Sequence, residues 1–197
     1  MTLVLKEEAA NYKPVEAGTY MAVCVGIYDL GVHHNEKFDK YQAKVMLQWE
    51  LIGETKDDGS PILIAKDFTA SFNSKSNLRK DLESWRGKQF TAEELAGFDL
   101  SNILKLPCQL QIIHKEVGDR VYANISGIMG VPKGTVVPEV ETKVVTFDLD
   151  KDTALDDLGA LPGWIQNKVK QSKTYEQMTR EPEPFDDVPE GDGELPF

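Results

Sequence analysis

Lysines and aromatic residues occur together in several polar stretches of the chain, a combination that suits the binding of a single nucleic-acid strand. Aromatic rings can stack on bases, and each stacked base contributes about 1–3 kcal/mol. Cations neutralise phosphates and make such binding salt-dependent. The residues that could take these roles are His34, Lys37, Phe38, Lys40, Lys44, Lys66, Phe68, Phe72, Lys75, Lys115, Arg120 and Tyr122.

Several of these aromatic residues have a purely structural alternative. Phe38 stands in a polar stretch, which favours a stacking role. Phe68 alternates with two isoleucines and is equally consistent with a core position. Tyr122 also suits an ordinary solvent-facing strand position. Trp49 and Trp85 lie on apolar faces, and we expect both in the core.

The sequence offers little that could support catalysis. It has no Gly-x-Gly-x-x-Gly motif and no phosphate-binding loop ending in Gly-Lys-Ser/Thr, so no cofactor is expected. The histidines and the two cysteines lack metal-site spacing, so no metal is expected. Glu141-Thr-Lys143 has the Glu-x-Lys form of some metal-dependent nucleases, but Glu54-Thr-Lys56 has it too. We therefore expect a protein that is not an enzyme, with a nuclease as the lower alternative.

The spacing of apolar residues predicts the elements that would position the binding residues. Strands are expected at 18–30, 40–52 and 61–70, followed by a helix at 74–86 capped by Ser74. The capping box Thr91-Ala-Glu-Glu94 predicts a short helix near 92–96. Strands at 105–114 and 120–129 complete the set. Gly26 suits a bulge within the first strand, and 31–39 reads as a turn.

Five strands with a helix between the third and the fourth follow the order of the OB-fold, a partly open Greek-key barrel. We predict a mainly β chain with an OB-like barrel over residues 1–130. Barrels of this type bind nucleic acid across strands 2 and 3 and between the 1–2 and 4–5 loops. The binding residues named above fall in these segments, with Lys44 on the polar face of the second strand.

Residues 131–180 form a C-terminal extension in this interpretation. Proline and glycine mark a connector after Gly130, 144–147 suits a short added strand, and 161–172 suits a small helix with Pro162 in its first turn. No stretch of 18 apolar residues and no secretory signal occurs, so we expect a cytoplasmic protein without a membrane span. Cys24 and Cys108 are expected as reduced core residues.

Residues 181–197 contain seven of the 33 acidic residues, four prolines and no basic residue. Such a segment is expected to be disordered. The rest of the chain holds 26 acids against 22 bases, so a local basic groove is possible despite the net charge of −11. The segment finishes on Asp192, Glu194, Leu195, Pro196 and Phe197, an apolar end that a merely solubilising tail does not need.

This ending resembles the acidic, Pro-Phe-terminated tip of bacterial single-stranded DNA-binding proteins. Together with the OB-like strand order, it makes the chain similar to a bacteriophage single-stranded DNA-binding protein. The resemblance implies a protein that coats single-stranded DNA in the bacterial host cytoplasm during phage replication and recombination. It also implies that the tip recruits a polymerase, helicase, nuclease or recombinase.

The main alternative is an acidic adaptor that binds a replication enzyme and no nucleic acid. The sequence leaves open whether the protein forms a homo-oligomer, and whether the tail competes with DNA for the groove.

Overall fold

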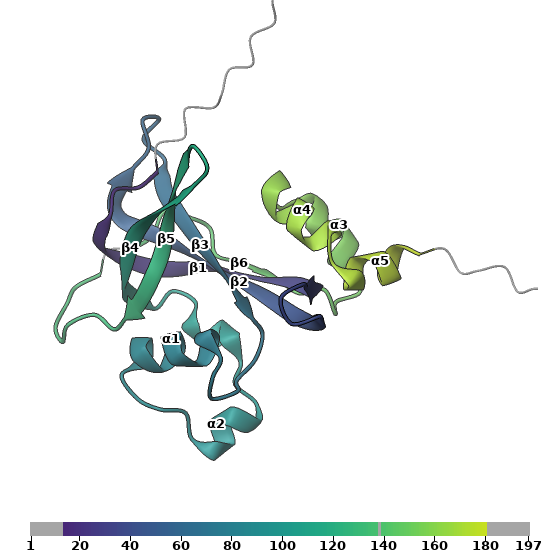
Figure 1. Cartoon of the computed structure of the whole chain (residues 1–197). Coiled ribbons are helices and arrows are strands. Elements are labelled where there is room, and N and C mark those ends of the chain that lie inside the picture. The colour runs from purple at the N-terminus through teal and green to yellow at the C-terminus, as the bar shows by residue number, and fades with distance from the viewer. Residues whose placement is uncertain (1–13, 138, 181–197) are drawn as a thin grey trace, which may run out of the picture.

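The body of the protein is an antiparallel sheet with the strand order β3-β2-β1-β4-β5 (Figure 1). This computed structural model describes residues 14–137 and 139–180. The strands are β1 (Gly18–Asn35), β2 (Lys40–Thr55), β3 (Pro61–Thr69), β4 (Pro107–Val117) and β5 (Arg120–Met129). The predicted order of five strands with a helix after the third is confirmed. In the described part of the chain, no hydrogen-bonded ladder joins β3 to β5.

Two bulges bend the long strand β1. The pairing with β2 shifts register between Cys24 and Gly26, which confirms the predicted bulge, and again between Asp29 and Gly31. The Tyr28 ring folds over Gly26, so that a Cβ there would lie 2.5 Å from the ring. The strand continues to Asn35 instead of ending at Leu30, so the predicted turn at 31–39 is shorter.

The main core lies between the sheet and helix α1 (Asn77–Arg86). Leu47, Trp49 and Leu51 of β2 are at most 1% exposed. The Trp85 ring packs against Trp49 with centroids 6.1 Å apart, and Trp85 Nε1 donates to the Pro107 carbonyl at 2.7 Å. Both tryptophans are core residues, as predicted. The helix begins later than expected: Ser76, not Ser74, is the N-cap residue, and its side chain makes no capping bond.

The segment between α1 and β4 contains helix α2 (Ala92–Ala96) and the 3₁₀ helix η1 (Leu100–Ile103). The predicted capping box is present: Glu94 N donates to Thr91 Oγ1 at 3.2 Å, and Thr91 N donates to Glu94 Oε2 at 3.0 Å. These bonds satisfy two amide groups that a helix start leaves without intrahelical partners.

The extension after Gly130 contains more structure than the sequence indicated. It comprises a short strand β6 (Val145–Phe147), parallel to β1, and the helices α3 (Ala154–Gly159), α4 (Gly163–Lys170) and α5 (Lys173–Thr179). The helix expected at 161–172 is confirmed as α4, whereas α3 and α5 were not predicted. Figure 1 shows the three helices together on one side of the sheet.

A second core forms where the extension covers the β1–β2 face that faces away from α1. It joins sheet residues to residues of the extension: Tyr28, Leu30, Met46, Phe147, Leu149, Ala154, Leu158, Ile165 and Val169. Two polar residues of this face, Gln48 and Glu50, are buried with partners. Tyr28 Oη donates to Gln48 Oε1 at 2.9 Å, and the Glu50 carboxylate accepts from the amides of Glu141 and Thr142. The polar face expected of β2 is therefore half covered.

Helix α5 is attached to β1 at the second bulge. Gly31 has φ +76°, and a Cβ there would lie 2.6 Å from Ser172 Oγ. Ser172 is buried and accepts from Tyr175 N at 3.0 Å, while Val32 N donates to Thr174 Oγ1 at 2.9 Å. Within the described ranges, no helix is long and apolar enough to cross a membrane.

Candidate nucleic-acid interface

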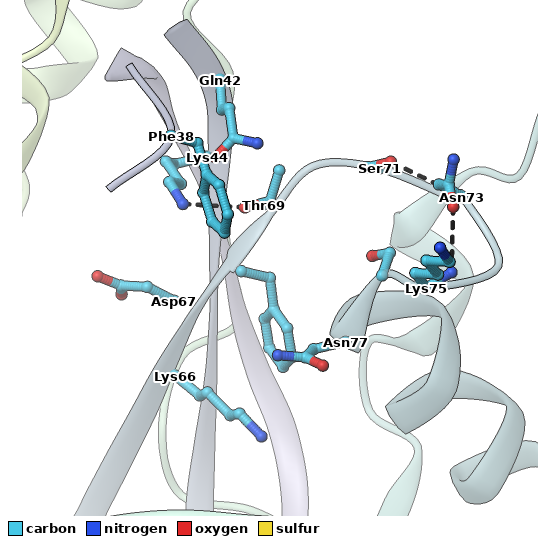
Figure 2. Close-up of a pocket in the computed structure, with 12 residues that line it drawn as sticks. Phe38, Gln42, Lys44, Lys66, Asp67, Thr69, Ser71, Asn73, Lys75 and Asn77 are labelled. Atoms are coloured by element: carbon cyan, nitrogen blue, oxygen red, sulfur yellow. Dashed lines mark hydrogen bonds between the residues drawn. The ribbon is translucent and has the colours of Figure 1, made fainter. Parts of the chain in front are cut away.

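A shallow groove of about 590 Å³ lies along β3, between the β1–β2 hairpin and the start of α1. In Figure 2, Phe38 and Lys44 lie beside Thr69, and the loop of Ser71, Asn73 and Lys75 lies across from them. Five of the residues predicted for nucleic-acid binding line this groove: Phe38, Lys44, Lys66, Phe68 and Lys75. The fold therefore brings together residues from three separate segments of the chain.

Phe38 presents the groove's exposed aromatic ring. It stands in the tight turn between β1 and β2, where its amide donates to the Asn35 carbonyl at 3.2 Å, and it is 60% exposed. Lys37 Nζ lies 5.5 Å from the ring centroid. The ring has no core role, so stacking on a base would remove apolar surface from water without disturbing the fold.

Phe68 and Phe72 are placed differently. Phe68 is 3% exposed and belongs to the main core, which is the structural alternative considered above. The Phe72 ring packs edge-to-face against Phe90 and Phe98, at 5.1 and 5.8 Å between centroids. Phe68 therefore lines the groove as a buried core ring, whereas Phe72 lies outside it and packs on other aromatic rings.

The groove's lysines differ in how far their charge is balanced. Lys66 Nζ forms a partly buried ion pair with Asp81 at 2.7 Å. Lys44 Nζ donates to the neutral Thr69 hydroxyl at 2.9 Å, and this bond leaves its charge uncompensated. No ion pair is found for Lys44 or Lys75 among residues 14–137 and 139–180. These two lysines are therefore the groove cations best placed to meet a phosphate.

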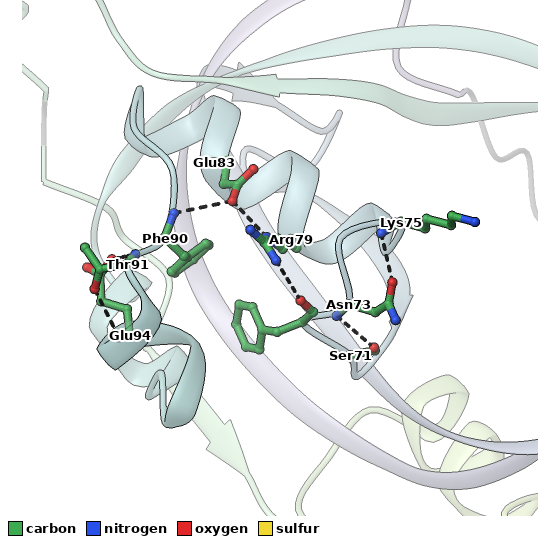
Figure 3. Close-up of polar contacts among 9 residues, drawn as sticks. Ser71, Asn73, Lys75, Arg79, Glu83, Phe90, Thr91 and Glu94 are labelled. Atoms are coloured by element: carbon green, nitrogen blue, oxygen red, sulfur yellow. Dashed lines mark hydrogen bonds and ion pairs between the residues drawn. The ribbon is translucent and has the colours of Figure 1, made fainter.

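Short-range hydrogen bonds hold the loop that carries Lys75 (Figure 3). Asn73 N donates to Ser71 Oγ at 3.2 Å, and Lys75 N donates to Asn73 Oδ1 at 3.1 Å. Arg79 Nη1 donates to the Phe72 carbonyl, and its Nε pairs with Glu83 at 2.9 Å. Bonds of this kind fix the backbone before a ligand arrives, which reduces the entropy lost on binding.

The first turn of α1 also faces the groove, through Ser76 and Asn77. It contains no acidic residue. The first amides of a helix lack intrahelical partners and carry partial positive charge. The partial positive charge of the helix start and the positive charge of Lys75 therefore both favour an anion at this end of the groove.

The other predicted residues lie outside the groove. His34, Lys37 and Lys40 flank Phe38 on the β1–β2 hairpin, where His34 Nε2 lies 2.9 Å from Asp39 Oδ1. Lys115, Arg120 and Tyr122 lie on the β4–β5 hairpin. β4 pairs with the start of β1, Gly18 opposite Ile112, whereas the β1–β2 hairpin closes at the other end of β1, Asn35 opposite Lys40. The 1–2 and 4–5 loops thus lie at opposite ends of β1, and none of these six residues lines the groove.

Sequence reasoning missed the polar lining, chiefly Gln42, Thr69, Ser71 and Asn77. A place for Gln42 in the groove could have been predicted, because it lies two residues from Lys44 on the same polar face of β2. The place of Thr69 could not, because its position opposite Lys44 depends on the β2–β3 register. Ser71 resembles ordinary turn composition. The tail residues Asp192, Glu194, Leu195, Pro196 and Phe197 lie outside the described residues.

No cluster of three or more His, Cys, Asp or Glu side chains suited to a metal ion occurs in the described part of the chain. The Glu-x-Lys residues Glu141 and Lys143 are exposed on the irregular segment before β6. The amide of Glu141 is bound by Glu50, whose carboxylate thus has a structural role. Neither the protein-family models nor the curated proteins contain a match to this chain.

Proposed function

We propose that this protein binds single-stranded DNA across β2 and β3, as an OB-like barrel of the bacteriophage single-stranded DNA-binding type. The observation that carries the proposal is one groove that holds the exposed Phe38 ring and two lysines without an ion pair, Lys44 beside the ring and Lys75 across from it (Figure 2). Stacking surface and phosphate-binding charge are the two requirements for sequence-tolerant binding of a single strand.

In this proposal, a base stacks on Phe38 while the neighbouring phosphates meet Lys44 and Lys75. The polar lining offers hydrogen bonds to sugars and base edges without a fixed donor and acceptor pattern. The protein would therefore coat exposed strands with little sequence preference, as replication and recombination intermediates require. A duplex presents no unstacked base to Phe38 and should bind far more weakly.

The acidic residues 181–197 are proposed to recruit replication or recombination proteins. The Leu195-Pro196-Phe197 end would enter an apolar pocket on the partner, and the acids would face a basic rim. The same acidic segment is also proposed to compete with DNA for the groove. Removal of 181–197 should then strengthen DNA binding at low salt.

Fluorescence anisotropy of labelled oligo-dT tests the proposal directly. The intact protein should bind with salt-sensitive affinity. Phe38→Ala should weaken binding about 5- to 150-fold, the equivalent of one stacked base. Val136→Ala is the matched control, since Val136 is 90% exposed and does not line the groove. Oligo-U and a duplex, titrated in parallel, report the preference for DNA and for single strands.

Other outcomes identify the alternatives. Absence of oligo-dT binding at low salt, together with capture of a replication enzyme that depends on Phe197, would establish the acidic adaptor. Mg²⁺-dependent degradation of the oligonucleotide, lost in Glu141→Gln, would establish the nuclease. Equal binding by wild type, Phe38→Ala and Val136→Ala would place any DNA site away from the groove.

A further inference from the structure

Two aromatic residues beyond the groove are exposed, and each has a lysine from the extension over its ring. Tyr41, at the start of β2, is 58% exposed, and Lys173 Nζ of α5 lies 4.4 Å from its ring centroid. Trp164, on α4, is 46% exposed, and Lys168 Nζ lies 5.9 Å from its ring. Exposed large aromatic rings with cations beside them are typical of single-strand binding surfaces.

These pairs adjoin the groove. Lys168 forms an ion pair with Asp67, which lines the groove on β3. Tyr41 lies on the same β1–β2 hairpin as Phe38, and the His34 ring lies 5.1 Å from the Tyr41 ring. Helix α4 therefore lies next to β3 at the groove, and α5 lies next to the β1–β2 hairpin.

The charge of the extension is distributed unevenly. Residues 163–173 contain three lysines and no acid, whereas residues 148–157 contain five aspartates and one lysine. Ile165 and Val169 of α4 face the second core and are fully buried. Trp164 and Lys173 are exposed and do not contribute to that packing, so both can contact a ligand, whereas Lys168 is paired with Asp67.

We propose that the extension enlarges the single-strand site, with a strand running from Phe38 past Tyr41 and Lys173 to Trp164 on α4. This inference rests on the proposed function and adds to it a second stacking platform outside the barrel. The ligand is the continuation of the same strand, so the added contacts affect only oligonucleotides long enough to leave the groove.

Tryptophan fluorescence can isolate the new contact. The chain has three tryptophans, and Trp49 and Trp85 are 0% and 7% exposed. Quenching by stacked thymine must therefore come mainly from Trp164. We expect oligo-dT of about 16 nucleotides, the upper end of an OB-fold site, to quench the emission of the intact protein. The quenching should disappear in Trp164→Phe.

Affinity measurements provide the second readout. Trp164→Ala should weaken binding of the long oligonucleotide about 5- to 150-fold and leave binding of one of about four nucleotides unaffected. Lys173→Ala should also weaken only the long one. Leu155→Ala and Lys151→Ala, exposed residues of the same extension, are the controls and should bind as wild type. Thermal unfolding of each variant verifies that the fold is intact.

The outcomes separate the two proposals. If the intact protein binds long oligo-dT, but Trp164→Ala and Lys173→Ala bind equally well, the inference is overturned and the groove site remains. Quenching that persists in Trp164→Phe overturns it as well. If the intact protein binds no oligo-dT at low salt, both proposals fail together.

Discussion

Replacing Gly31 by alanine tests how the extension is attached to the sheet. At φ +76° an added Cβ costs about 1–2 kcal/mol in backbone strain. The Cβ would also lie 2.6 Å from Ser172 Oγ and 2.8 Å from Ser172 Cβ, at the start of α5. Such overpacking in a filled site costs about 1–3 kcal/mol more. The total expected loss in the free energy of unfolding is therefore about 2–5 kcal/mol.

Gly53 in β2 provides the matched control. Its φ is +83°, and an added Cβ would meet nothing within 4 Å. Gly53→Ala should therefore cost only the backbone part, about 1–2 kcal/mol. The difference between the two variants measures the contact with Ser172 alone.

Urea or thermal unfolding followed by circular dichroism gives both values. For a chain of this size, each kcal/mol corresponds to about 2–4 °C in Tm. Gly31→Ala should unfold at a distinctly lower temperature than Gly53→Ala. Equal losses in the two variants would refute the attachment of α5 at the second bulge, and with it the position of the extension beside the groove.

Three further predictions concern buried polar groups. Burial raises the pKa of Asp29, and repulsion from Asp150 and Asp148 adds to the shift, although hydrogen bonds from the Gly31 and Leu149 amides oppose it. The folded state therefore binds the proton more tightly than the unfolded state. Stability then falls as the pH rises from the ordinary Asp pKa through the raised one. Asp29→Asn should become more stable relative to wild type over that range in urea titrations at several pH values, and a difference independent of pH would contradict this. Burial also raises the pKa of the Cys24 thiol to about 12 and that of the Cys108 thiol further, so native protein should react with a thiol reagent at pH 8 only at the rate of unfolding, and fast labelling of either would contradict the buried positions. Glu50→Leu should cost about 1–3 kcal/mol, because two amides of the extension lose their acceptor, whereas Glu50→Gln, which keeps an acceptor, should cost less in the same unfolding assay.

The strands of the sheet were predictable because their residues follow simple local rules. Strand β2 alternates so regularly that Leu47, Trp49 and Leu51 could be assigned to the core. The Thr91-Glu94 capping box marked α2, and Gly26 marked the bulge in β1. In each case the signal lies within a few residues, where local sequence decides the conformation.

The rest depends on contacts between distant segments. The sequence indicated a polar face of β2 with Lys44 on it, but nothing local shows that residues 141–169 cover Met46 and Glu50 of the same face. Gly31 suggested a turn, and only the docking of Ser172 shows why β1 continues through it. The groove shows the same limit. Phe38 and Lys44 were recognisable individually, but the separation of the β4–β5 hairpin from the groove depends on how β4 pairs with β1.

The central claim is that phosphates of a single strand meet Lys44 in the β2–β3 groove. The most direct test is the salt dependence of oligo-dT affinity for wild type, Lys44→Gln and Lys133→Gln, whose lysine lies outside this groove. Each phosphate contact with a single strand contributes about 0.7 to the slope of log K against log salt concentration. We predict that Lys44→Gln makes the slope less steep by about this amount, whereas Lys133→Gln leaves the slope unchanged. A slope unaffected by Lys44→Gln would contradict the account.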